Sequence, residues 1–111
     1  MARYRALAVY QPYAQWIADG HKTVEVRSWQ SLVRGEIAIC ATTRNPHQSP
    51  HPTGVVAAIV NLHQIDPFEV DDERAAMVPW RPNHYAWRLR DARPLKPIPV
   101  RCGMKWFWVD I

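Results

Sequence analysis

The order of apolar and polar positions predicts a chain built mainly from short β-strands. In the clearest case the residues alternate strictly, with Val24 and Val26 on one face and polar side chains on the other. Two long apolar runs rich in β-branched residues are typical of buried strands. The predicted strands are Arg3–Val9, Thr23–Trp29, Gly35–Thr42, Gly54–Ile65, His84–Arg90 and Lys105–Val109, the last two joined by a proline-rich segment.

Two short helices are predicted between these strands. The first begins at Gln11-Pro12, since proline suits a first helical position, and ends at Gly20. In the second, Asp66 and Glu69 have the spacing of a capping box and start an acidic helix that ends before Pro79. Two short helices cannot cover both faces of a parallel sheet. We therefore predict a mainly β or α+β fold, a small β-barrel of about five or six strands with two short helices.

Length and composition indicate one ordinary globular domain over residues 1–111. No apolar run approaches the roughly 20 residues of a membrane span, and the N-terminal apolar stretch is too short for a signal peptide. We expect a cytoplasmic monomer without a cofactor or membrane partner. Cys40 lies within an apolar run and is expected to be a small core residue. Trp87, Trp106 and Trp108 are also expected in the core.

The charge is distributed unevenly. Fourteen Lys and Arg against ten Asp and Glu give a formal charge of +4, and five of the ten acids lie within residues 66–73. That acidic segment alone would support a protein-interaction module. Six basic residues lie near the C-terminus and predict either a surface for a polyanion or a solvated strand face. They are Arg88, Arg90, Arg93, Lys96, Arg101 and Lys105.

The residues with the most distinctive chemistry follow Gly20. Lys22, Glu25 and Arg27 fall within six residues, with Lys22 in the turn after a helix end and the other two on the polar face of the strand that follows. Lysine supplies a point charge or an amine, glutamate accepts protons or base amino groups, and arginine offers a planar fork for phosphate or carboxylate. These residues predict a compact polar pocket. The alternative is a solvated strand face with one Glu–Arg ion pair.

Three segments of the sequence resemble the ASCH domain, named for homology to activating signal cointegrator. They are QPYAQWIADGHKTVEVRSW, RGEIAICATT and PTGVVAAIVNL. Gly20, Lys22, Glu25 and Arg27 fill the family's Gly-x-Lys-x-x-Glu-x-Arg element. The resemblance implies a PUA-like β-barrel and binding of RNA, of single-stranded nucleic acid, or of a nucleoside or nucleotide.

On this reading, Lys22 and Arg27 meet phosphate or carbonyl oxygens, and Glu25 accepts from the amino group of a base. Trp29 and Tyr10 supply stacking surfaces. The loop that starts at Arg44 contains two histidines without further ligands, so no metal site is expected. The full set of expected ligand-binding residues is Tyr10, Gln11, Pro12, Lys22, Glu25, Arg27, Ser28, Trp29, Thr42, Thr43, Arg44 and Asn45.

One branch of the family implies an alternative, a small amidohydrolase that acts on an acetylated cytidine. The catalytic lysine of that branch falls on Lys22, but its catalytic threonine falls on Glu25. Thr23 occupies the neighbouring position, and the branch's glutamate has only Glu69 and Glu73 as candidates by order. If the protein is an enzyme, Lys22 and Glu25 are the expected catalytic residues, with Glu25 as a base rather than a nucleophile. Turnover of an N-acylated cytidine separates the two functions.

Overall fold

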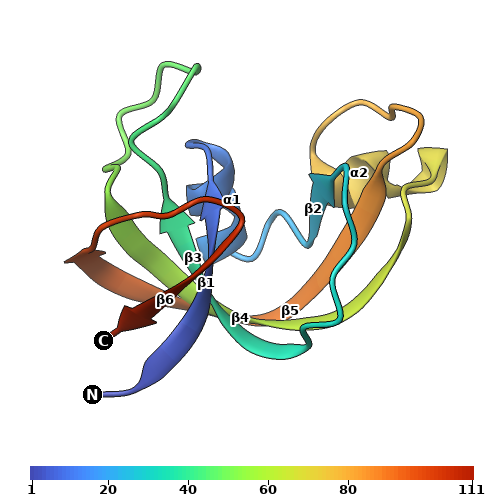
Figure 1. Ribbon diagram of the computed structural model, residues 1–111. Coiled ribbons are helices and arrows are strands. Elements are labelled where there is room, and N and C mark those ends of the chain that lie inside the picture. Colours follow the sequence, from blue (N-terminus) through green and yellow to red (C-terminus); the bar gives the residue numbers. More distant parts are fainter.

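The computed structural model describes residues 1–111 and contains one six-stranded sheet and two short α-helices (Figure 1). The strand order is β2-β5-β4-β3-β1-β6. β1 pairs with β3 in parallel, and every other pairing is antiparallel. The elements are β1 (Arg3–Val9), α1 (Tyr13–Ala18), β2 (Val24–Arg27), β3 (Gly35–Ala41), β4 (Val55–Pro67), the 3-10 helix η1 (Val70–Asp72), α2 (Glu73–Ala76), β5 (Tyr85–Pro99) and β6 (Trp106–Asp110).

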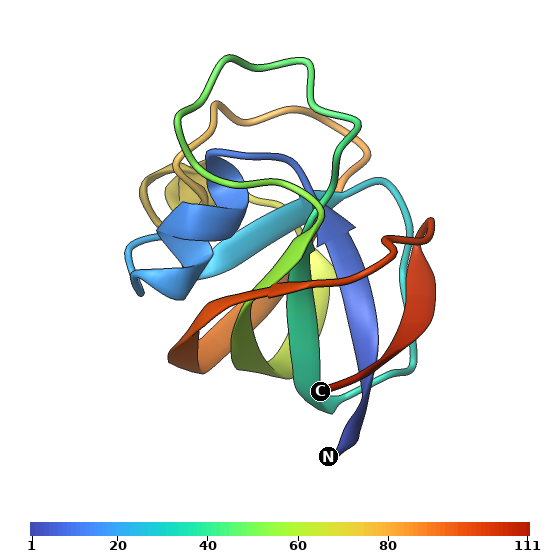
Figure 2. The same cartoon turned by 90° about the vertical axis from the view of Figure 1, so that its left-hand side faces the viewer.

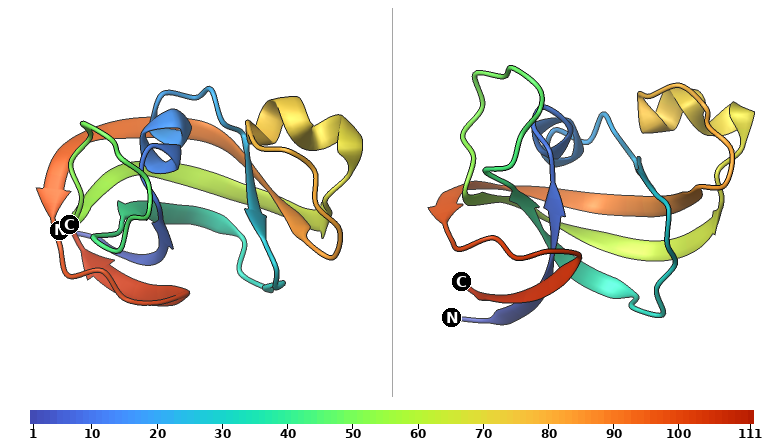
Figure 3. Two further views of the ribbon diagram at one scale, coloured as in Figure 1. Left: turned by 90° about the horizontal axis from the view of Figure 1, so that it is seen from above. Right: turned by 45° about the horizontal axis from the view of Figure 1, so that its top comes forward.

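The sheet curves around α1. β4 and β5 are the longest strands, and irregular registers along them let the sheet bend, so that α1 lies against its concave side (Figure 3). The prediction of a mainly β fold with six strands and two short helices is confirmed. The sheet is not a closed barrel, because its edge strands β2 and β6 do not pair with each other. Neither helix has the length and hydropathy required to span a bilayer.

The main core lies between α1 and the sheet. Ala14, Ile17 and Ala18 of α1 are buried against apolar side chains of the sheet strands, among them Leu7 and Trp87. Two of the three helix residues are alanines, so the helix backbone can approach the sheet closely. The chain termini meet at the far end of the molecule from α1, where two backbone hydrogen bonds join Ala2 and Ile111 (Figure 2).

The predicted start of the second helix is wrong by several residues. Asp66 belongs to β4, where it pairs with Ala86 of β5. The capping box is formed instead by Glu69 and Asp72, and α2 begins at Glu73. The local capping signal at Asp66 loses because continued pairing in the long β4–β5 hairpin satisfies the backbone there. Its carboxylate also accepts hydrogen bonds from Arg88.

The proline-rich segment is a strand and not a connection, since β5 continues to Pro99. β2 pairs only with the first residues of β5, from Tyr85 to Arg88. Beyond Leu89, whose N–H donates to Thr23, β5 pairs with β4 alone, so its prolines affect the ladder on one side of the strand only. β4 pairs along the other side, with Val55 opposite Pro99.

The three C-terminal tryptophans occupy different environments. Trp87 is fully buried and Trp106 packs against the same core. The prediction for Trp108 is wrong, because its side chain is 50% exposed. Its ring lies on the solvent side of the β1–β6 pair, where the guanidinium groups of the exposed Arg3 and Arg5 are 4.9 and 4.7 Å from the ring centroid.

Candidate functional site

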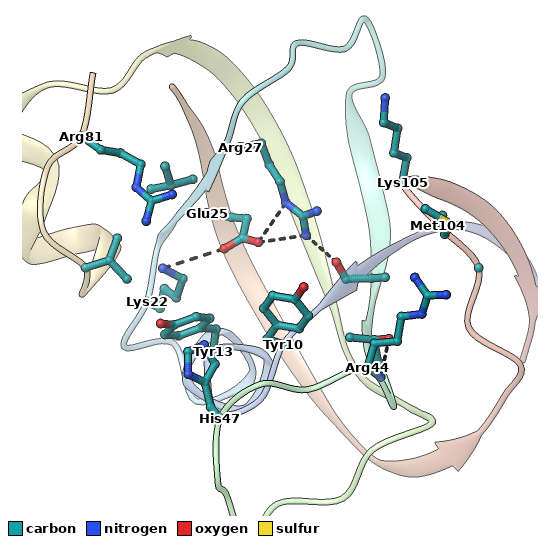
Figure 4. A pocket seen from close by; sticks show the side chains of 15 residues that line it. Tyr10, Tyr13, Lys22, Glu25, Arg27, Arg44, His47, Arg81, Met104 and Lys105 are labelled. Carbon is teal, nitrogen blue, oxygen red and sulfur yellow. Dashed lines mark hydrogen bonds and ion pairs between the residues drawn. The ribbon is translucent and has the colours of Figure 1, made fainter. Parts of the chain in front are cut away.

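A cavity of about 500 Å³ opens between β2, the start of α1 and three loops (Figure 4). The loops that follow β3 and α2 lie at the same end of the molecule as α1 (Figure 2). The volume lies within the range of about 300–1,000 Å³ typical of small-molecule sites. The cavity is lined by Ala8, Tyr10, Tyr13, Lys22, Glu25, Val26, Arg27, Thr42, Arg44, His47, Val78, Arg81, Gly103, Met104 and Lys105.

Lys22 is held in this cavity by the turn that follows α1. Gly20 adopts a φ of +80°, which favours glycine, and ends the helix. The backbone N–H of Lys22 then donates to the carbonyl oxygen of Trp16 at 3.0 Å, and that of Thr23 donates to Ala75 at 3.0 Å. These bonds fix the backbone on both sides of the lysine. Its side chain is almost completely buried and donates from Nζ to the carbonyl oxygen of Ala76.

Lys22, Glu25 and Arg27 form a triad, here called the buried triad, in which Lys22 and Glu25 are buried and Arg27 is partly buried. Glu25 Oε1 lies 3.9 Å from Lys22 Nζ, Oε2 accepts from Arg27 Nε at 3.0 Å, and Arg27 Nη2 lies 3.0 Å from the same oxygen as an ion pair. Arg27 Nη2 also donates to the carbonyl oxygen of Ala8 in β1. The alternation of β2 thus places the carboxylate between two cations, and the triad links β2 to β1 and to the end of α2.

Burial changes the protonation of the triad's amine. The pKa of Lys22 is lowered from its ordinary value, mainly because burial penalises the charged ammonium group. The carboxylate of Glu25 raises this pKa and the guanidinium of Arg27 lowers it further, but burial is the largest effect. The amine therefore gives up its proton more readily than a solvated lysine does.

Aromatic side chains form one wall of the cavity. The Tyr13 ring lies 5.3 Å from the His47 ring and 5.1 Å from Lys22 Nζ, while Tyr10 lies 5.9 Å from His47. Both ring pairs are edge-to-face, and Tyr10 is 44% exposed. No three His, Cys, Asp or Glu side chains come close enough to hold a metal ion.

The cavity wall is strongly cationic. Lys22, Arg27, Arg44, Arg81 and Lys105 contribute five positive charges, and Glu25 contributes the only carboxylate.

A model of the ASCH domain matches residues 7–99. The chain belongs to the ASCH domain family. No curated protein sequence matches it significantly.

Solved ASCH structures have the same fold. The ASCH protein from Zymomonas mobilis has a TM-score of 0.74 and 21% sequence identity, with 96% of this chain and 87% of that chain covered. Two single-residue mutants of the same Zymomonas mobilis protein each give a TM-score of 0.69 and 20% identity. These alignments cover 96% of this chain and 87% or 89% of the other. At 20–21% sequence identity, this similarity shows that the two proteins share a fold and nothing more.

Half of the predicted ligand-binding residues line the cavity of this ASCH domain, namely Tyr10, Lys22, Glu25, Arg27, Thr42 and Arg44. The other six lie outside it, namely Gln11, Pro12, Ser28, Trp29, Thr43 and Asn45. The structure shows what three of the six residues do instead. Gln11 is fully buried with both ends of its amide hydrogen-bonded, Asn45 binds the backbone of its own loop, and Ser28 is an exposed turn residue.

Trp29 does not provide a stacking surface in the cavity. Its ring packs edge-to-face on Trp87 at 4.7 Å and on Trp106 at 6.2 Å, as part of the hydrophobic core. β2 ends at Arg27, so the strand alternation that would place Trp29 beside Glu25 and Arg27 stops before it. The aromatic side chains that do line the cavity are Tyr10, Tyr13 and His47.

The predicted basic surface is divided by ion pairs. Arg88 binds Asp66 at 2.7 Å and Asp72 at 2.9 Å, and Arg93 binds Glu36 at 2.9 Å. Arg90 lies 3.8 Å from Asp91, whereas Lys96 and Arg101 are exposed and unpaired. Lys105 alone of the six lines the cavity. The Arg88 pairs also neutralise part of the acidic segment, which weakens the case for a separate protein-interaction surface there.

Several cavity residues were absent from the sequence-based site. Tyr13 could have been proposed from its place next to Tyr10 at the helix start. His47, Arg81 and Met104 come from three different loops, and nothing in their local sequence indicates that they share a cavity.

Proposed function

We propose that this ASCH domain binds RNA or single-stranded nucleic acid by taking one nucleotide into the cavity. The observation that supports this most strongly is the composition of the cavity wall. Five cations, one buried carboxylate and an aromatic wall surround a space of about 500 Å³. Such a site complements a ligand that combines negative charge, a planar ring and polar ring edges. The relation of the ASCH family to PUA-like RNA-binding domains supports the same function.

Each part of the wall has a matching part of a nucleotide. Tyr10 offers a half-exposed ring on which a base can stack. Arg27 uses Nε and Nη2 for Glu25 and Ala8, so Nη1 remains free to donate to a carbonyl or phosphate oxygen. The carboxylate of Glu25 can accept from an exocyclic amine, as Asp and Glu do with cytosine.

Anisotropy of a fluorescein-labelled, random-sequence RNA hexamer tests this function. Stacking on one ring contributes about 1–3 kcal/mol, so we expect Tyr10→Leu to weaken binding about fivefold to a hundredfold. Trp108→Leu is the control, since Trp108 is an exposed ring outside the cavity. Absence of binding by the unmodified protein, or equal losses in the two variants, would contradict the proposed function.

A second candidate, hydrolysis of an acetylated cytidine, is favoured by the Lys22–Glu25 pair. The amine has a lowered pKa and lies 3.9 Å from a carboxylate, and both groups line the cavity. Glu25 is the only carboxylate there, because Glu69 and Glu73 lie outside the cavity and Glu73 accepts from the Trp80 backbone. Thr23 is exposed and also outside it, so Glu25 would have to activate water.

Acetate release from N4-acetylcytidine separates this candidate from a binding function. A hydrolase should turn the compound over and lose turnover in Glu25→Gln, whose amide cannot accept a proton from water. A protein that binds RNA in the cavity without releasing acetate supports the binding function alone.

A further inference from the structure

The cavity contains two kinds of cation. In the buried triad both cations contact the carboxylate of Glu25, so only one positive charge there is left unmatched. Three other cations, here called the rim cations, are Arg44, Arg81 and Lys105. All three are exposed, and none has a carboxylate within ion-pair distance. Three of the four unmatched positive charges of the cavity thus lie on its rim.

Hydrogen bonds and ion pairs do not account for the positions of the rim cations, and only Lys105 has an internal partner, the ring of Trp29. The side chains of Arg44 and Arg81 make no hydrogen bond within the protein, and the ammonium of Lys105 lies 5.4 Å from the Trp29 ring centroid. They come from three separate segments, after β3, after α2 and before β6. Their repulsion across one cavity is relieved most directly by an anion.

The rim cations lie on two sides of the cavity. Figure 4 shows Arg81 on one side, and Arg44 and Lys105 on the other, beyond Arg27. The backbone agrees with this view. Lys22 binds the end of α2, whose following loop carries Arg81. On the opposite side, Arg27 binds β1, and β1 lies beside the segments that carry Arg44 and Lys105, because it pairs with β3 and β6.

We infer that the ligand carries a phosphate on each side of the base that enters the cavity. This inference rests on the proposed function and narrows it to an internal nucleotide of a strand rather than a free nucleoside. Arg81 contacts one phosphate, and Arg44 with Lys105 contacts the other. Arginine suits this role because its planar fork binds two phosphate oxygens at once.

The presence of rim cations on both sides of the cavity distinguishes between a nucleoside, a nucleotide with one phosphate and a nucleotide with two. A nucleoside, even when it fills the space between the triad and the aromatic wall, leaves all three rim cations unmatched. A monophosphate reaches the cations of one side only. Two phosphates, one on each side of the sugar, match both sides, so the strand crosses the cavity from Arg81 toward Arg44 and Lys105.

Calorimetric titration of small ligands tests the inference. For each of the four ribonucleosides, the dissociation constant is measured for the nucleoside, the 5′-monophosphate and the 3′,5′-bisphosphate at fixed ionic strength. We expect each added phosphate to tighten binding by about tenfold, the effect of one charge-assisted contact of about 1.4 kcal/mol. Arg81→Gln should cancel the gain from one phosphate, and Arg44→Gln the gain from the other. Lys96→Gln, which removes an unpaired charge outside the cavity, should cancel neither.

Two results would overturn the inference and leave the proposed function intact. One is a nucleoside that binds as tightly as its bisphosphate. The other is a loss of the same phosphate's contribution in both Arg81→Gln and Arg44→Gln. If neither these compounds nor the labelled RNA hexamer binds, the inference and the proposed function are both wrong.

Discussion

The side-chain amide of Gln11 donates from Nε2 to the carbonyl oxygen of Pro52 at 2.9 Å. This bond joins the start of α1 to the far end of the loop that carries Arg44 and His47. The amide oxygen of Gln11 accepts from the backbone N–H of Gln15 at 2.9 Å, so both ends of this buried side chain are used. Gln11 therefore lies outside the cavity but connects α1 to the loop that contributes Arg44 and His47 to its wall.

Gln11→Ala should lower the free energy of unfolding by about 1–3 kcal/mol, because the Pro52 carbonyl and the Gln15 N–H lose their partners. Urea unfolding measures this loss. Gln15→Ala is the control, since its side chain makes only an exposed hydrogen bond to Asp19. Equal losses in the two variants would show that the bond to Pro52 does not hold the loop.

Glu25→Gln should cost about 3 kcal/mol of stability, because it leaves the buried Lys22 and the partly buried Arg27 without their counter-ion. Glu36→Gln is a matched control. Glu36 also pairs with an arginine, but both side chains of that pair are more than half exposed, so its loss should stay within about 1 kcal/mol. Urea unfolding of both variants at pH 7 compares the buried pair with the exposed one, and similar losses would contradict the buried triad.

Stability should depend on Lys22 at alkaline pH. The pKa of Lys22 is lowered below 10.5 in the folded protein, so between the lowered pKa and 10.5 the unfolded chain binds more protons. Stability therefore rises with pH through this window. Lys22→Met lacks this group, and the stability of the unmodified protein relative to the variant should increase as pH rises from 7 to 10.5. Parallel pH profiles from chemical unfolding would contradict it.

Arg88 should act as a structural residue rather than a nucleic-acid contact. Its contacts with Asp72 lower the pKa of that carboxyl from 3.8, so they stabilise the fold above pH 3.8 and are lost as pH falls through the lowered pKa. Arg88→Gln should cost about 2 kcal/mol at pH 7 and less at acid pH. Unfolding at several pH values checks this, and the affinity for the RNA hexamer should not change.

Cys40 should resist alkylation in the folded protein. Burial raises the pKa of its thiol to about 12, and burial also raises the pKa of Cys102. The thiolate is the reactive form, so iodoacetamide at pH 7.5 should modify both cysteines far more slowly in the native than in the urea-unfolded protein. Mass spectrometry after timed quenching gives the two rates. Fast native labelling of Cys40 would show that this strand opens.

The sequence by itself determined the local secondary structure and the three residues of the buried triad. Strand alternation placed Glu25 and Arg27 on one face, and the glycine after α1 placed Lys22 beside them, because these relations depend on backbone geometry over a few residues. The mainly β fold followed from the same kind of local pattern. Its limits showed at Asp66, where a local capping signal lost to the pairing of the long β4–β5 hairpin.

Only the tertiary structure decided which distant side chains complete the cavity. Arg81, His47 and Lys105 line the same cavity as the triad because loops after α2, after β3 and before β6 converge there. No periodicity links residues so far apart in the chain. Tertiary packing also explains why some predicted residues lie outside the cavity. The ring of Trp29 packs on Trp87 and Trp106 in the core, because burying an aromatic ring is favourable. Arg88 likewise pairs with Asp66 and Asp72, which are distant in the sequence, so its local sequence does not predict these ion pairs.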